Sequence, residues 1–221
     1  MKKLALIHTV SWYDKAVIEP FACKWQKENK DVQIINIMDD SLLDDSLANK
    51  GATRAVLQRL IFYVLAAESA GADVAMITCT TVGEASRLAR GFVSIPVFNI
   101  DEPMAKQAVR KGKKLGILAT VPTSAPATRR LLEIEAQQAG RQIHIETVIN
   151  KKAFTHLLKG EVEKHNELVC REIDKLAEKV DVIVLGQISL SQIKHKTKVP
   201  VLQVGHSGFA QARRLLNRLS K

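Results

Sequence analysis

The segment Lys2–Val10 reads KKLALIHTV, and the segment Lys113–Val121 reads KKLGILATV. Two further pairs follow these in the same order along the chain: Ala72–Cys79 with Val180–Gln187, and Ile95–Ile100 with Val199–Val204. Three matched pairs in one order indicate an internal duplication, and they predict two halves with the same fold. The copies differ at one chemically important position, because Cys79 of the first half corresponds to Gln187 of the second.

Short apolar runs alternate with longer amphipathic stretches, which is typical of βαβ units and parallel sheets. The predicted strands are Leu4–Thr9, Val32–Ile37, Val74–Thr78 and Pro96–Ile100 in the first half, and Leu115–Ala119, Ile143–Val148, Val182–Leu185 and Val201–Val204 in the second. The clearest predicted helices are Ala52–Ala70 and Glu161–Val180. The expected fold class is therefore α/β, with two pseudo-symmetric lobes, each a four-stranded parallel sheet flanked by helices.

The domain organisation follows from the duplication. We expect residues 1–100 plus 205–221 to form lobe one and residues 101–204 to form lobe two, within a single compact two-lobed unit. Asp101 is predicted to begin the helix after the last strand of lobe one. The helix that follows Val201–Val204 is expected to pack back on lobe one.

The composition is that of a globular protein, with 46% hydrophobic and 25% charged residues. A net charge of +10 favours anionic partners. Nucleic acid is not expected, because no basic run is interleaved with aromatic residues, and no apolar run is long enough to cross a membrane. We therefore expect a small anionic carboxylate as substrate, no nucleic-acid or membrane partner, and a homo-oligomer.

Signals for targeting, metals and cofactors are weak. The N-terminus begins like a secretory signal, but the polar residues His8 and Thr9 interrupt its apolar core, so we expect a cytoplasmic protein. Three cysteines match no zinc pattern or disulfide framework. The sequence has no Gly-rich phosphate loop or dinucleotide fingerprint, and the aspartates of the segment Met38–Asp45 fit no calcium loop. We expect neither a metal nor a cofactor.

Ligands bind at the carboxyl ends of the strands in open parallel sheets. Cys79 follows such a strand and precedes a predicted helix start, where the helix dipole favours a thiolate. We expect a lowered pKa that makes Cys79 a usable base near neutral pH, although a buried cysteine that acts only as a small hydrophobe fits the same pattern. Cys23 and Cys170 lie inside predicted helices, and we expect no function for them.

Other polar residues also follow the predicted strands. His8 ends the first strand, and two roles stay open for it: contact with the substrate, including proton transfer, or structural hydrogen bonding. Hydroxyl groups at such positions either bind a carboxylate or cap a helix. The candidate substrate-binding residues are Thr9, Thr80, Thr81, Thr120, Thr123, Ser124, Ile188 and Ser189. His206 is a weaker candidate, and Met38–Asp45 is a candidate flap.

Four segments resemble the aspartate/glutamate/hydantoin racemase superfamily: Ile77–Thr81 (ITCTT), Gly116–Thr123 (GILATVPT), Asp181–Ser189 (DVIVLGQIS) and Val199–Leu202 (VPVL). The resemblance implies two α/β lobes with the active site in the cleft between them. It also implies chemistry without a cofactor, in which two cysteines flank the substrate Cα. Cys79 matches the first cysteine. Gln187 stands where the second is expected, and its amide has no titrating proton.

Three functions stay open on this basis. The first is a racemase or isomerase acting at the Cα of an amino acid, dicarboxylate or hydantoin-like compound, with Cys79 as acid/base and Gln187 as a polar stabiliser. The second is a lyase, such as a decarboxylase, in which one thiol protonates an enediolate from a single face. The third is a non-catalytic protein that binds a carboxylate.

Overall fold

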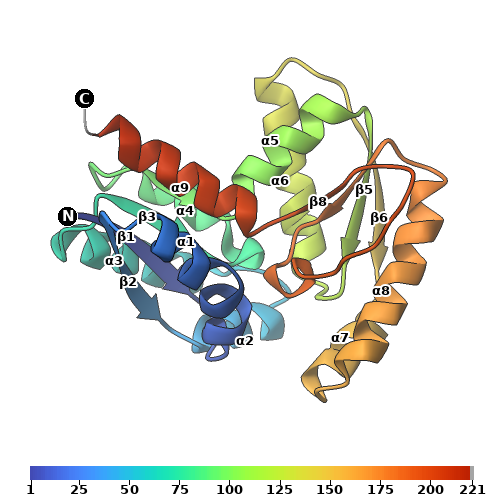
Figure 1. Cartoon of the computed structure of the whole chain (residues 1–221), viewed down its shortest axis with the longest axis horizontal. Coiled ribbons are helices and arrows are strands. Elements are labelled where there is room, and N and C mark those ends of the chain that lie inside the picture. The colour runs from blue at the N-terminus through green and yellow to red at the C-terminus, as the bar shows by residue number, and fades with distance from the viewer. Residues whose placement is uncertain (220–221) are drawn as a thin grey trace. The chain divides into compact units, whose positions relative to one another are not determined.

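The computed structural model describes residues 1–219, which form two compact units (Figure 1). Unit 1 comprises Met1–Glu102 together with the segment that begins at Gly205, and unit 2 comprises Pro103–Val204. Each unit contains one four-stranded parallel sheet, with strand order β2-β1-β3-β4 in unit 1 and β6-β5-β7-β8 in unit 2. The two orders are equivalent, so the α/β fold class with two similar halves is confirmed.

The strands of unit 1 are β1 (Lys2–His8), β2 (Val32–Met38), β3 (Val74–Ile77) and β4 (Val97–Asn99). Its helical elements are η1 (Asp14–Ala22), α1 (Cys23–Glu28), α2 (Ser41–Ala48), α3 (Arg54–Ser69), η2 (Thr80–Val82), α4 (Glu84–Ala89) and α9 (His206–Arg218). Glu102 begins α5 (Glu102–Lys111), which leads into unit 2.

The sheet of unit 1 is covered on both faces, as a parallel sheet requires. Successive side chains of a strand point to opposite faces. Ala5 and Ile7 pack in one core with Leu60 of α3 and Ala85 of α4. The other face receives η1, α1 and α9, and Phe209 of α9 stacks on Phe21 and contacts the tilted ring of Trp25. Figure 1 shows α9 beside these strands, and Lys2 donates a hydrogen bond from Nζ to the carbonyl of Leu216.

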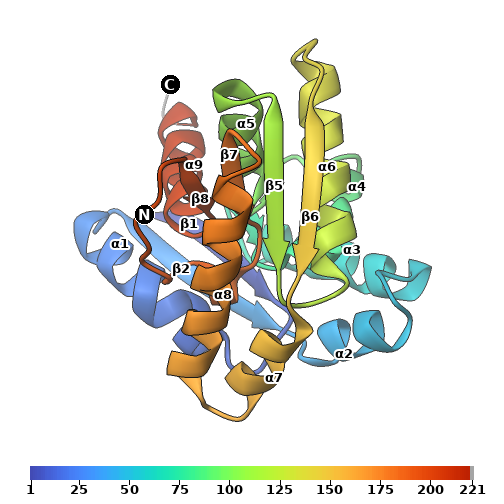
Figure 2. The same ribbon diagram turned by 90° about the vertical axis from the view of Figure 1, so that its right-hand side faces the viewer.

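The strands of unit 2 are β5 (Lys114–Ala119), β6 (His144–Ile149), β7 (Val182–Leu185) and β8 (Val201–Gln203). Its remaining helices are α6 (Ser124–Gln138), α7 (Lys151–Leu158), α8 (Val162–Ala177) and the short η3 (Ile188–Leu190). Figure 2 shows α6 and α8 on opposite sides of this sheet. On the α8 side, Leu118, Ile183 and Leu185 pack against Val169 and Ile173.

All eight predicted strands are present, with ends that differ by at most two residues. The helical elements η1, α2, α7 and η3 were not predicted. The prediction of a flap over Met38–Asp45 is wrong. Residues 41–45 form the start of α2, and hydrogen bonds fix the side chain of Asp39. The Asp39 carboxylate accepts hydrogen bonds from Ser41 Oγ (2.6 Å), Tyr63 Oη (2.8 Å) and Arg59 (3.2 Å).

Candidate active site

Cys79 lies at the carboxyl end of β3, immediately before the short helix η2. Its sulfur receives hydrogen bonds from the Thr9 hydroxyl and from the backbone N–H groups of Thr81 and Val82. The side chain is only partly exposed. The turn after β3 therefore points three donors at one thiol, an arrangement that favours its thiolate form.

The protonation of Cys79 differs from the sequence prediction. Burial raises the pKa of the thiol above its usual value, and this effect outweighs the three hydrogen bonds, which lower it. The negative charge of Asp101 raises the pKa further. The predicted lowering is wrong because η2 is a single turn, whose dipole is too small to offset desolvation.

Asp101 is an acidic side chain that the sequence reading assigned only to a helix start. It directly precedes α5 and is 1% exposed. Its carboxyl accepts hydrogen bonds from Asn99 Nδ2 (2.6 Å) and from the Thr80 side chain. Burial raises the pKa of Asp101 to about 7, the charge of Glu102 adds to this, and the two hydrogen bonds oppose it.

His8 is fully buried at the end of β1, where its ring stacks on Tyr13 with centroids 4.2 Å apart. Nδ1 lies 3.0 Å from Thr78 Oγ1, and Nε2 lies 3.0 Å from Asn36 Oδ1. Asn36 Oδ1 is an acceptor, so Nε2 carries the proton of the neutral ring. The Thr78 hydroxyl also lies 3.1 Å from the Ile7 carbonyl oxygen, so its single hydrogen is shared between that oxygen and Nδ1 of His8. Burial lowers the pKa of His8 to about 4, so the ring is neutral at pH 7.

Gln187 occupies the position in unit 2 that corresponds to Cys79 in unit 1, directly after β7. Its Oε1 accepts the backbone N–H groups of Thr120 (2.6 Å) and Val121 (3.2 Å), and its Nε2 donates to Thr120 Oγ1 (3.3 Å). The amide therefore joins the ends of β7 and β5. Within the described part of the chain, the second hydrogen on Nε2 is the one polar group of this side chain without a partner.

The other candidate residues divide between the two units. Thr9, Thr80 and Thr81 are buried in unit 1 beside Cys79. In unit 2, Thr120, Thr123 and Ser124 are buried between β5 and α6, and the Ser124 hydroxyl donates to the carbonyl of Val121 (2.8 Å). Ile188 and Ser189 begin η3 and are partly exposed. Each set lies at the carboxyl ends of its own sheet.

Three polar side chains of unit 1 lie next to the candidate residues but were not predicted from the sequence. Asn36 lies near the carboxyl end of β2 and contacts His8. Asn99 is the last residue of β4, Asp101 follows two residues later, and the two side chains contact each other. The signal was available in the motif Asn99-Ile100-Asp101, since the rule applied to β1 and β3 holds equally for β4.

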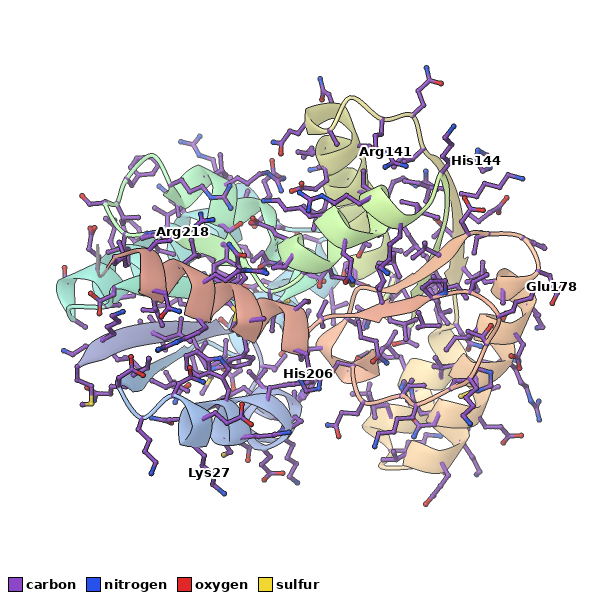
Figure 3. All side chains as sticks on the ribbon, turned by 45° about the horizontal axis from the view of Figure 1, so that its top comes forward. Lys27, Arg141, His144, Glu178, His206 and Arg218 are labelled. Atoms are coloured by element: carbon purple, nitrogen blue, oxygen red, sulfur yellow. The ribbon has the colours of Figure 1, made fainter. Side chains whose placement is uncertain are left out.

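Outlying candidates lie apart from these clusters. His206 begins α9 and is exposed (Figure 3). Its ring lies nearly at a right angle to that of Phe21, with centroids 5.0 Å apart. Cys23 is exposed, and Cys170 is partly exposed in α8. A separate hollow of about 460 Å³ in unit 2 is lined by Ile173, Ile193, Lys194, His195, Lys196, Val201 and Gln203, and it includes no candidate residue.

The described residues contain neither a metal-binding cluster nor a membrane-spanning helix. In residues 1–219, no three His, Cys, Asp or Glu side chains are grouped so that they could hold a metal ion. None of the helices described is long and apolar enough to span a membrane.

Comparison with known proteins identifies the family. Residues 25–196 match the model of the Asp/Glu/hydantoin racemase family, which is more than half of the chain. The chain therefore belongs to this family, and the resemblance seen in its sequence motifs is confirmed. A search of curated protein sequences found no match.

Solved structures share the fold. Glutamate racemase isoform RacE1 from Bacillus anthracis is similar with a TM-score of 0.71 and 14% identity, over 98% of this chain and 82% of that one. An aspartate racemase homologue from Pyrococcus horikoshii OT3 gives 0.67 and 21%, over 100% of both chains. Allantoin racemase from Klebsiella pneumoniae gives 0.58 and 18%, over 100% and 89%.

Proposed function

We propose that this protein is a cofactor-independent racemase or isomerase that acts at the Cα of a small carboxylate, with Cys79 as its acid/base. The substrate class comprises amino acids, dicarboxylates and hydantoin-like compounds. The family supports the reaction class. The observation that carries the proposal is the setting of the Cys79 sulfur, which receives one hydroxyl and two backbone N–H donors at a strand end.

The raised pKa of Cys79 bears directly on this role. A thiol with a raised pKa is less often ionised at neutral pH, but its thiolate is a stronger base towards a carbon-bound proton. When the proton has moved from Cα to sulfur, the thiol is neutral, and its three hydrogen-bond donors no longer stabilise a negative charge. The planar carbanion turns its opposite face towards the sulfur, and the same thiol then returns the proton to that face, which inverts Cα. A single cysteine thus serves as base in one step and as acid in the next.

For Gln187 we propose a stabilising role that involves no proton transfer. Its remaining Nε2 hydrogen is a donor for a carboxylate or an enolate-like oxygen. The strand-end hydroxyl residues Thr9, Thr80, Thr81, Thr120, Thr123, Ser124 and Ser189, with Ile188, are proposed to bind the substrate. A homo-oligomeric state and a cytoplasmic location stay predictions.

A lyase reaction is the second candidate, and one observation favours it. Gln187 has no proton to give, and Cys79 is the neutral thiol at rest because burial raises its pKa. A neutral thiol suits the protonation of an enediolate from one face after loss of a fragment such as carbon dioxide.

Proton labelling in D₂O separates these functions. The protein is incubated with panels of amino acids, dicarboxylates and hydantoins, and the Cα–H signal is followed by NMR together with optical rotation. A racemase exchanges Cα–H and forms both enantiomers, whereas a lyase releases a fragment and labels one face of the product. Saturable binding of a panel member with neither outcome supports the carboxylate-binding protein instead. Cys79→Ala must remove the activity, and Cys170→Ala is the matched control.

A further inference from the structure

We propose that Asp101 is a positioning residue that controls the charge of Cys79: around neutral pH the two side chains share a single negative charge, so the Asp101 carboxyl then holds a proton when Cys79 is a thiolate, and both groups ionise only at higher pH. This inference rests on the proposed role of Cys79 as the reactive group. It adds a residue at the end of β4 to a site otherwise built from the ends of β1 and β3.

The contacts connect the two residues through Thr80. Thr80 follows Cys79 in the chain, and its side chain hydrogen-bonds to the Asp101 carboxyl. Asp101 is 1% exposed and Thr80 is 5% exposed, so little water screens one charge from the other. The pKa of each group is raised, and the Asp101 charge is among the causes for Cys79. Two nearby anions without a cation between them do not both ionise readily.

Asn99 is able to serve both charge states of Asp101. Its Nδ2 donates to the carboxylate at 2.6 Å, while its Oδ1 is buried without a partner among the described residues. A carboxylic acid needs an acceptor for its proton. If the amide turns over, Oδ1 accepts that proton, and the unpaired acceptor is satisfied. If Asp101 were always ionised, Asn99 Oδ1 would have no proton to accept and would stay buried without a hydrogen bond.

No other charged group nearby accounts for the control of the Cys79 charge that we assign to Asp101. The titratable and charged groups on neighbouring elements include Glu84 and Arg87 of α4, Arg90 directly after α4, Glu102 and Lys106 of α5, His8 of β1, and Asp39 after β2. The Glu102 carboxylate is neutralised by Arg90 at 2.7 Å and also accepts from Ser86 and the Asn99 N–H. Asp39 is paired with Arg59, and His8 is neutral at pH 7. From α9, the residue that meets Ile100 is the uncharged Gly208.

The test measures how fast iodoacetamide alkylates Cys79 as a function of pH, in a Cys23→Ser, Cys170→Ser background where Cys79 is the remaining cysteine. Only the thiolate attacks, forming a carbon–sulfur bond and releasing iodide. Asp101→Asn is expected to lower the midpoint of the profile by roughly one pH unit or more, and to speed alkylation at pH 7 several-fold. Asp73→Asn, at the other end of β3, is expected to leave the midpoint unchanged. An unchanged or raised midpoint in Asp101→Asn overturns the inference.

Two further measurements cover the case in which Asp101→Asn does not fold. Thr80→Val removes a hydrogen bond that favours the Asp101 carboxylate, and it is expected to lower the Cys79 midpoint as well. The unsubstituted pair is expected to give a profile in two steps, because coupled groups titrate together. A profile that fits one simple ionisation overturns the inference. Alkylation needs no substrate, so a reactive Cys79 without turnover would overturn the proposed function alone.

Discussion

At the scale of single residues, two substitutions of Gln187 separate its structural role, which belongs to Oε1, from its proposed role in substrate binding, which belongs to Nε2. Gln187→Leu leaves the buried N–H groups of Thr120 and Val121 without an acceptor, and we expect it to destabilise unit 2 by about 1–3 kcal/mol. Gln187→Glu keeps an acceptor for both groups but loses the Nε2 donor. We expect it to retain most of the stability and to raise KM for an anionic substrate.

Thermal unfolding followed by circular dichroism measures the stability of both Gln187 variants, and hydrogen exchange at Thr120 and Val121 locates the effect. Equal stability of Gln187→Leu and the unsubstituted protein would contradict the hydrogen-bonding role assigned to Oε1. An unchanged KM in Gln187→Glu would contradict the role proposed for Nε2.

His8 makes the stability of unit 1 depend on pH. Its pKa is 6.5 when unfolded and about 4 when folded, so the unfolded state binds the proton first as the pH falls. The stabilisation is fully present above pH 6.5 and is lost towards pH 4. We expect a loss of about 3 kcal/mol between pH 7 and pH 4 from this group.

Urea unfolding at several pH values checks this dependence, because both tryptophans, Trp12 and Trp25, lie in unit 1 and report on it. His8→Phe removes the titrating ring and serves as the reference. The account of His8 fails if the two proteins lose the same free energy of unfolding between the two pH values.

At the scale of elements, the packing of α9 depends on a glycine. A Cβ on Gly208 would lie 2.6 Å from Ile100 Cγ1 and 3.1 Å from the Ile100 carbonyl oxygen. Since the backbone oxygen cannot move aside, we expect Gly208→Ala to push α9 away from β3 and to cost about 1–3 kcal/mol. Gly91→Ala is the matched control in the same unit, because its Cβ would meet only the Leu88 carbonyl oxygen at 3.7 Å.

Urea unfolding followed by tryptophan fluorescence compares these two glycine variants, since Trp25 packs against Phe209 of α9. If Gly208→Ala is as stable as Gly91→Ala, the packing of α9 does not depend on the close contact between Gly208 and Ile100.

At the scale of the whole molecule, the sequence determined the fold more completely than the site. The repeated apolar runs predicted all eight strands. The central strands β1, β3, β5 and β7 are buried and apolar along most of their length, as strands inside a parallel sheet must be, whereas the edge strand β6 is largely exposed and gave a weaker signal. α2 was missed because its sequence, Ser41–Ala48, is acidic and loop-like, and its folding depends on contacts of Asp39 with Arg59 and Tyr63.

The chemistry of the site was less predictable for a physical reason. The position of Cys79 at a strand end follows from the local pattern, but the direction of its pKa shift depends on burial and on Asp101, which is distant in sequence. Likewise, the pattern placed Gln187 after β7 but gave no information on its bonds to the backbone at the end of β5. Desolvation and long-range contacts have no local signature in a single sequence.

The central claim is that the sulfur of Cys79 moves the substrate proton. The most direct measurement is the rate of Cα–H exchange in D₂O for the best substrate, compared between Cys79→Ala and the control Cys170→Ala. We predict a loss of about 10²-fold or more in Cys79→Ala and little change in the control, as expected for removal of a general acid/base. Exchange at the unsubstituted rate in a folded Cys79→Ala protein would contradict the claim.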